Sequence, residues 1–247
     1  MISQNMRNTK CLTLYLGNCP IFIAFWYNHL VNKALVLKQT QEFVRKRMEK
    51  ESTGHDWWHI ERVLRMAKHI AKAEQNCNMF IIELAAFLHD IADWKFHKGD
   101  DTVGPEVARK WLKELKVENS IILHVCNIVK NISFKGAGVA NKIKTKEGMI
   151  VQDADRLDAL GAIGIARAFA TGSKFNIEIY NPNVKPKKHK TFQEYKKERG
   201  TTVNHFHEKL LLLKDIMNTE TARKIAEERH GFMEQYLKEF YREWKGQ

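Results

Sequence analysis

The sequence predicts an all-α fold, and three observations support that prediction. Apolar residues recur at a spacing of three to four over long stretches, which is the period of an amphipathic helix. Only 4 Pro and 13 Gly occur among 247 residues, and 44% of the residues are hydrophobic, enough for a sizeable core. Strand-like alternation is confined to a short stretch at 176–180. We therefore expect a compact multi-helix bundle.

The first 36 residues are expected to lie outside this bundle, which then comprises residues 37–247 as a single domain. An apolar run from Cys11 to Trp26 resembles a signal peptide, but Gly17 and Pro20 interrupt it and no small-residue cleavage site follows. The run is also shorter than the ~20 residues of a membrane span. We interpret residues 1–36 as an N-terminal extension from a start codon assigned too far upstream. A weak membrane anchor is the alternative, although no membrane partner is expected.

The helices can be assigned in order along residues 37–247. A polar, helix-forming stretch covers 39–49, and Ser52 to Gly54 ends it. A long helix is expected over 55–75, and Asn78 is placed to cap the next one, which runs to about Ala92. Further helices are expected over the ranges 104–116, 119–132, 146–171, 204–217 and 220–243.

The longest irregular segment is 172–200. Its part 181–200 contains seven Lys or Arg against two Glu. A loop of this length is usually functional or without fixed structure. An electropositive lid over a phosphate-bearing substrate and a solvated basic loop both stay open.

The overall charge indicates the class of partner, and the cysteines indicate the redox state of the compartment. The formal net charge of +12 suits anionic partners, namely nucleic acid, an acidic membrane surface or phosphorylated small molecules. The four cysteines form no C-x-x-C pair and no disulfide framework. Free thiols in a reducing compartment are expected, and we predict a cytoplasmic protein.

Ionisable residues interrupt two strongly apolar helices. His89 and Asp90 end the hydrophobic stretch 80–88, and Asp153, Asp155 and Asp158 lie in a segment that is apolar on nearly every face. A buried carboxylate needs a cation or a metal ion, because desolvating a lone charge is very costly. On a helix, Asp153 would share an inward face with Leu157 and Leu160, and Asp158 a face with Ala154, Gly161 and Ile165.

A third segment adds imidazoles. His55 and His59 are four residues apart and would share one face of a helix. Nitrogen and carboxylate donors from three separate helices form a mixed set that suits Mn, Fe, Co, Zn or Mg.

The order His59, then His89-Asp90, then an aspartate at 153 resembles the signature of the HD-domain metal-dependent phosphohydrolases. The resemblance covers about residues 37–245 and is closest to small stand-alone microbial members, some of which cleave nucleoside triphosphates to monophosphate and pyrophosphate. Its motifs are 55–59, 88–96, 132–134, 153–159, 206–211 and 217–219.

The resemblance implies an HD-domain bundle with a metal-site core at about 55–161 and C-terminal helices within 204–243. It implies one divalent ion, with Mn²⁺ favoured and Mg²⁺, Co²⁺, Fe²⁺ or Zn²⁺ as alternatives. The implied metal ligands are His59, His89, Asp90 and Asp153. Asp93, one turn past Asp90, is the expected general acid or base.

Cations in or beside these motifs are expected to contact the phosphates of a nucleotide substrate: Arg62, Lys95, Arg156 and Lys209. Each could instead neutralise a nearby acid. His55 and Asp56 are expected to orient His59. Trp57 and Trp58 either stack on a base or pack in the core.

The implied activity is a phosphohydrolase that acts on nucleotides, with a (deoxy)nucleoside triphosphate favoured. A 5′-nucleotidase or a cyclic-nucleotide phosphodiesterase is the alternative within the same chemistry. A non-catalytic, basic nucleic-acid-binding module is the alternative from another class, and nucleic acid is otherwise a secondary partner.

Overall fold

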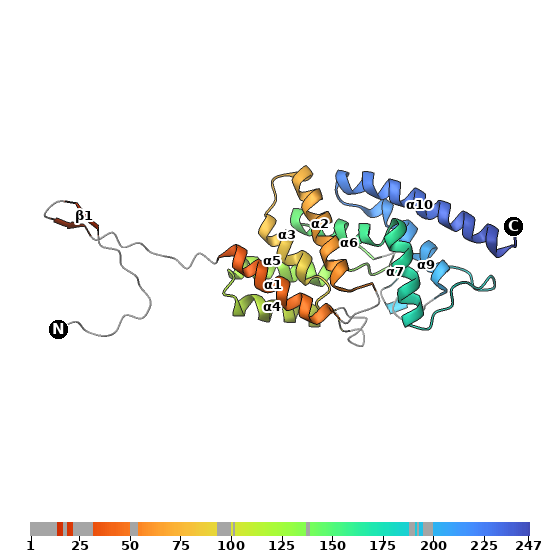
Figure 1. The fold of residues 1–247 in the computed structure, drawn as a ribbon, viewed down its shortest axis with the longest axis horizontal. Coiled ribbons are helices and arrows are strands. Elements are labelled where there is room, and N and C mark those ends of the chain that lie inside the picture. Colours follow the sequence, from red (N-terminus) through yellow and green to blue (C-terminus); the bar gives the residue numbers. More distant parts are fainter. Residues whose placement is uncertain are drawn as a thin grey trace.

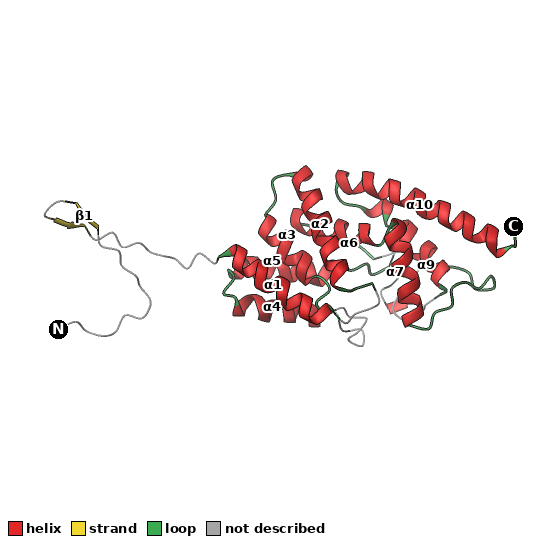
Figure 2. Cartoon of the chain, in the orientation of Figure 1, coloured by secondary structure: helices red, strands yellow, loops and turns green. Residues whose placement is uncertain are grey.

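The computed structural model describes residues 14–16, 19–21, 32–49, 54–92, 100, 102–136, 139–187, 191, 193–194 and 200–247. Helices dominate this part of the chain, and the predicted all-α fold is confirmed (Figure 2). Two three-residue strands, β1 (Leu14–Leu16) and β2 (Cys19–Ile21), pair antiparallel within the predicted N-terminal extension.

The helical part begins four residues before the expected domain boundary. Its elements, in chain order, are α1 (Lys33–Met48), α2 (Trp57–Glu74), α3 (Met79–Leu88), α4 (Val103–Glu114), α5 (Asn119–Asn131), α6 (Lys146–Asp158), α7 (Gly161–Lys174), α9 (Thr202–Glu208), the 3-10 turns η2 (Leu210–Leu212) and η3 (Lys214–Ile216), and α10 (Glu220–Trp244).

Helix α6 lies at the centre of the bundle. It packs against α2 and α3 on one side and against α7 and α10 on the other, while α4 and α5 pair with each other beyond α3 (Figure 1). Nine of its thirteen residues are buried, among them three that are charged, Asp153, Arg156 and Asp158. The central helix therefore carries the acids whose burial requires an explanation.

Side-chain caps fix where two functional helices begin. The carboxylate of Asp56 accepts a hydrogen bond from the backbone N–H of His59 at 2.8 Å, which starts α2 at Trp57. The side chain of Asn78 accepts bonds from the N–H groups of Phe80 and Ile81 at 3.1 and 3.4 Å. The predicted cap at Asn78 is thus confirmed.

The single helix expected over 146–171 is wrong, because the chain breaks between α6 and α7. Leu160 is extended and Gly161 has a φ of +70°, a conformation that favours glycine. Arg229 of α10 packs against Gly161 and donates a hydrogen bond to the carbonyl of Leu157, which also accepts the N–H of Leu160 in the last turn of α6. After the break, α7 changes direction and packs against α10.

The helix expected over 204–217 is also replaced, by α9 followed by η2 and η3. The stretch 176–180 forms no strand, although the carbonyls of Glu178 and Ile179 accept hydrogen bonds from Thr202 and Val203. Among the described residues, none of the helices has both the length and the apolar character that crossing a membrane requires.

Candidate metal centre

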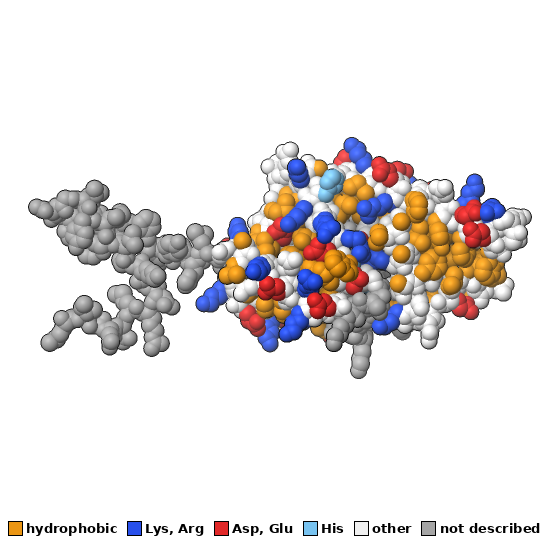
Figure 3. Space-filling model, in the orientation of Figure 1, with side chains coloured by type: hydrophobic (Ala, Val, Ile, Leu, Met, Phe, Trp, Pro, Cys, Tyr) orange, Lys and Arg blue, Asp and Glu red, His pale blue; other side chains and the backbone are white. Residues whose placement is uncertain are grey.

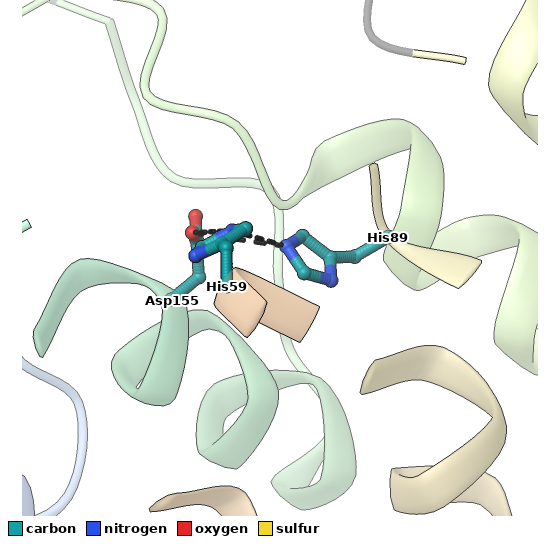
Figure 4. Close-up of side chains that lie close together, drawn as sticks. All are labelled: His59, His89 and Asp155. Carbon is teal, nitrogen blue, oxygen red and sulfur yellow. Dashed lines mark hydrogen bonds and ion pairs between the residues drawn. The ribbon is translucent and has the colours of Figure 1, made fainter. Parts of the chain in front are cut away.

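Two imidazoles and a carboxylate from three helices converge at the centre of the bundle. The Nε2 atoms of His59 and His89 lie 3.0 Å apart, and Oδ1 of Asp155 lies 3.5 Å from the first and 3.8 Å from the second (Figure 4). Both histidine side chains are fully buried, whereas that of Asp155 is 27% exposed. The cluster is therefore closed on the histidine side and reaches solvent on the side of Asp155.

Asp90 brings a second carboxylate to the same place. Its Oδ2 lies 3.3 Å from Nε2 of His59 and 3.6 Å from Nε2 of His89. This oxygen is buried, and it accepts no hydrogen bond from any residue that the structure describes. A buried carboxylate oxygen without a donor is costly. A metal ion bound to this oxygen would satisfy it.

Backbone and side-chain partners orient both imidazoles. His89 follows the last residue of α3, and its Nδ1 lies 2.8 Å from the carbonyl oxygen of Ala86. His59 lies in the first turn of α2, and its Nδ1 lies 2.7 Å from Oδ2 of Asp158. In each ring Nδ1 is the donor, because its partner is an acceptor only. Both Nε2 atoms thus turn their lone pairs to the cluster.

The electrostatics of the site favour the ionised form of Asp90. Burial acts to raise the pKa of Asp90, but the neighbouring imidazoles of His89 and His59 outweigh it and hold that pKa well below its usual range. Burial and the Arg167 guanidinium act to lower the pKa of His59. The carboxylates of Asp158 and Asp90 outweigh both and raise it above the ordinary value. The cluster is thus an environment that favours added positive charge.

His59, His89 and Asp155 have donor atoms that all lie within 4.8 Å of one another, as the ligands of one divalent ion do, and Asp90 reaches the same two imidazoles. Two ligands that each lie about 2.1 Å from an ion, at right angles, are about 3.0 Å apart, and wider angles bring separations of up to about 4 Å. The separations of 3.0 to 3.8 Å within the cluster lie in this range. Two neutral imidazoles and two carboxylates carry a charge of −2, which matches a divalent cation. The nitrogen and oxygen donors suit Mn, Fe, Co or Zn more than Ca.

The structure places Asp153 elsewhere, and the predicted ligand set has to be corrected at this residue. The Asp153 carboxylate accepts hydrogen bonds of 2.7 to 3.0 Å from the backbone and side chains of Asn218 and Thr219. Its side chain is fully buried, 3.8 Å from Nη1 of Arg156. It fastens the turn before α10 to α6 and is turned away from the histidines. Asp155 is the acid of α6 that lies in the cluster.

Two of the four predicted phosphate-binding cations are engaged with other groups. Both Nε and Nη2 of Arg62 donate to the carboxylate of Asp158, at 2.7 and 3.0 Å. Arg156 is buried and donates to the carbonyl of Ile216. Both guanidiniums are thus already hydrogen-bonded to acceptors of the protein, and their predicted contact with phosphate stays a prediction. Nζ of Lys209 lies 5.8 Å from the ring centroid of Phe134. Asp93 and Lys95 lie outside the described residues.

The remaining predicted residues divide between the core and the surface. Trp57 is buried and stacks on Phe87 with ring centroids 6.4 Å apart, whereas Trp58 is 60% exposed. The ring of His55 meets that of His59 edge-on at 5.7 Å. Asp56 orients His59 through the backbone as a helix cap and does not touch its ring nitrogens in the described contacts. The core interpretation therefore holds for Trp57 alone.

Sequence reasoning missed the roles of Asp155, Asp158 and Arg167. The signal that would have found the first two is their spacing, because residues three apart on a helix share a face. His59 lies against that face, with Asp155 at its Nε2 and Asp158 at its Nδ1. Nothing in the sequence pointed to Arg167, whose Nη1 donates to Asp158 at 2.9 Å.

Known proteins share this arrangement of sequence and fold. The family model of the HD domain matches residues 57–160. YpgQ of Bacillus subtilis, an uncharacterized protein, is 37% identical over 212 residues, which are 85% of this chain and 94% of YpgQ. YpgQ has been solved in complex with ADP; that structure has 35% identity and a TM-score of 0.64, with 84% of this chain and 97% of YpgQ covered.

Two further solved structures are similar over most of their length. An HD-superfamily hydrolase of Bacillus thuringiensis is 42% identical with a TM-score of 0.66, over 87% of this chain and 100% of that one. A protein of Lactobacillus plantarum is 33% identical with a TM-score of 0.77, over 86% and 98% of the two chains. With its matched motifs and its histidine–aspartate cluster, this chain belongs to the HD-domain superfamily of metal-dependent phosphohydrolases.

Proposed function

We propose that the protein hydrolyses nucleotides and that its favoured substrate is a (deoxy)nucleoside triphosphate, cleaved to monophosphate and pyrophosphate. The observation that carries the proposal is the cluster of His59, His89, Asp90 and Asp155, with donors matched to one divalent ion. The ADP complex of the relative YpgQ supports a nucleotide as the ligand. The proposed resident ion is Mn²⁺.

Each residue of the cluster has a distinct task in this proposal. His59 and His89 present Nε2 lone pairs because their Nδ1 atoms are held by Asp158 and by the carbonyl of Ala86. Asp90 and Asp155 supply the negative charge that retains a divalent ion. Such an ion, when bound, lowers the pKa of water and polarises a phosphoryl oxygen.

The phosphates and the transferred proton are assigned to residues near the cluster. We propose Lys209 and Lys95 as phosphate contacts, because both lie within the motifs that resemble the family, at 206–211 and 88–96. Asp93 is the proposed general acid or base, three residues after Asp90. Asp155 is the part of the cluster open to solvent, so substrate is expected to approach from its side.

A nucleotide panel tests the substrate. Purified protein is incubated with Mn²⁺, Mg²⁺ or Co²⁺ and with nucleoside mono-, di- and triphosphates and cyclic nucleotides, and phosphate and pyrophosphate are measured separately. Pyrophosphate released from a triphosphate is the expected result. Phosphate released from a monophosphate would identify a 5′-nucleotidase instead, and opening of a cyclic nucleotide would identify a phosphodiesterase.

The nucleic-acid-binding alternative receives no support from the surface that Figure 3 shows. On that face, Lys and Arg side chains alternate with acidic and apolar ones and do not merge into one basic patch. Binding through phosphates would weaken steeply with added salt, whereas metal-dependent turnover would not be abolished in the same way. A salt titration of turnover and of oligonucleotide binding separates the two functions.

A further inference from the structure

Three side chains from two other helices, α2 and α7, contact the carboxylate of Asp158. Oδ2 accepts from Nδ1 of His59 at 2.7 Å, from Nη2 of Arg62 at 3.0 Å and from Nη1 of Arg167 at 2.9 Å. Oδ1 accepts from Nε of Arg62 at 2.7 Å. The Asp158 side chain is only 6% exposed, so these contacts take the place of water.

Arg167 connects this carboxylate to the beginning of α2. Its Nε donates to the backbone carbonyl of Gly54 at 2.7 Å while its Nη1 donates to Asp158. A Cβ atom at Gly54 would lie only 2.9 Å from Cγ of Arg167, so the backbone and the guanidinium stem are in close contact. One side chain of α7 therefore holds both the segment before α2 and the partner of His59.

Arg62, which belongs to α2 itself, also binds the Asp158 carboxylate. It lies three residues after His59, on the same face of the helix, and binds both oxygens of Asp158. A guanidinium that donates two parallel bonds fixes the plane of a carboxylate as well as its position. Arg62 and Arg167 thus fix the orientation of the carboxylate that accepts the hydrogen bond of the His59 imidazole.

We propose that Asp158, held by Arg62 and Arg167, is a positioning residue that fixes the ring of His59 with Nδ1 protonated and Nε2 directed at the metal centre. The two guanidiniums more than offset the single negative charge of Asp158, so this carboxylate adds no net negative charge beside the ligands. This inference depends on His59 being a metal ligand and is independent of which nucleotide is the substrate.

Metal binding provides the test, because it does not require a substrate. Mn²⁺ affinity is measured by calorimetry, and the visible absorption of the Co²⁺-loaded protein reports the geometry of the ligands. Asp158→Asn is expected to lower the Mn²⁺ affinity by about 10- to 100-fold, as removal of partners of metal-bound histidines does. It is also expected to shift the Co²⁺ bands. Arg167→Ala should have a smaller effect, which Arg167→Lys partly restores.

A control on the same helix separates positioning from loss of stability. Glu74, at the other end of α2, accepts bonds from the backbone and hydroxyl of Thr221 at 3.2 and 3.0 Å. It lies about 22 Å along the helix from His59. Glu74→Gln should lower the melting temperature without changing Mn²⁺ affinity or the Co²⁺ spectrum.

Unaltered metal affinity and an unaltered Co²⁺ spectrum in folded Asp158→Asn protein would overturn the proposal. If that variant does not fold, Arg62→Lys and Arg167→Lys serve instead. Both keep the charge, but the first loses the paired bonds to Asp158 and the second cannot bind Gly54 and Asp158 in the same way. Wild-type affinity and spectrum in both would equally overturn it. An inactive nucleotide panel with normal metal binding would overturn the proposed substrate and leave this inference standing.

Discussion

The carboxylates of Asp153 and Asp155, two residues apart on α6, serve opposite sides of the bundle. Asp155 lies 3.5 Å from Nε2 of His59, whereas Asp153 accepts hydrogen bonds from the turn before α10. Two residues correspond to a rotation of about 200° around a helix, so side chains at this spacing point in nearly opposite directions. One helix thereby joins the metal centre to the C-terminal helix.

Replacing each of these two acids by asparagine should impair metal binding in one variant and stability in the other. Asp155→Asn is expected to abolish turnover and to weaken Mn²⁺ binding while the protein stays folded. Asp153→Asn should keep metal binding but destabilise the fold by about 1–3 kcal/mol, because donors of Asn218 and Thr219 lose a charged acceptor. Calorimetric metal titration and thermal unfolding of both variants check this. The reverse pattern would show that Asp153 is the ligand.

The two neighbouring tryptophans should also behave differently. Trp57→Ala is expected to cost about 3–5 kcal/mol of unfolding free energy, since a fully packed ring leaves a cavity. Trp58→Ala should change stability little, because the side chain is 60% exposed. Denaturant unfolding measures both. A raised KM for nucleotide in Trp58→Ala, with kcat unchanged, would indicate that this ring contacts the base.

The close approach at Gly54 predicts sensitivity to a single methyl group. Gly54 has a φ of +80°, and an added Cβ would contact Arg167. Gly54→Ala should destabilise the protein by about 1–2 kcal/mol from the backbone alone. It should also weaken Mn²⁺ binding, because Arg167 cannot move without disturbing Asp158. Gly231→Ala, where nothing lies within 4 Å of the added carbon, is the matched control.

Removing the metal should destabilise the protein as well as inactivate it. A ligand present at 100 times its Kd contributes about 2.7 kcal/mol to the folded state. The melting temperature should fall on chelation and recover with Mn²⁺. In His59→Gln, chelation should make little difference, since the metal-dependent increment is already lost. A chelator-insensitive wild-type protein with full activity would contradict the metal centre.

The sequence predicted the existence of the site better than its details. The start of α2, the cap at Asn78 and the pair His89-Asp90 follow local rules of capping and burial. The choice between Asp153 and Asp155 does not, because α6 is buried on nearly all sides. Hydrophobic periodicity identifies a buried face only where another face meets solvent. By sequence pattern, both acids are expected to point inward. Only the packing of α2 and α10 around α6 determines which of them faces the histidines.

The break between α6 and α7 was missed for a related reason. The segment 161–171 continues the apolar helical pattern, and its glycines alone do not determine where a helix stops. At the break, Gly161 has a φ of +70° and its backbone packs against Arg229 of α10, a residue far along the chain. Local propensity contains no information on such a partner. The 3-10 turns after α9 are likewise a result of tertiary packing.

The contact between His59 and Asp158 spans 99 residues, and the arginine that completes it comes later still, in α7. During synthesis, the two histidines leave the ribosome well before α6 and α7. Long-range contacts of this kind form late, because the chain between them must first be closed into a loop. We therefore expect a metal ion to be bound firmly only by a nearly complete chain, and fragments that end before α7 to bind it weakly.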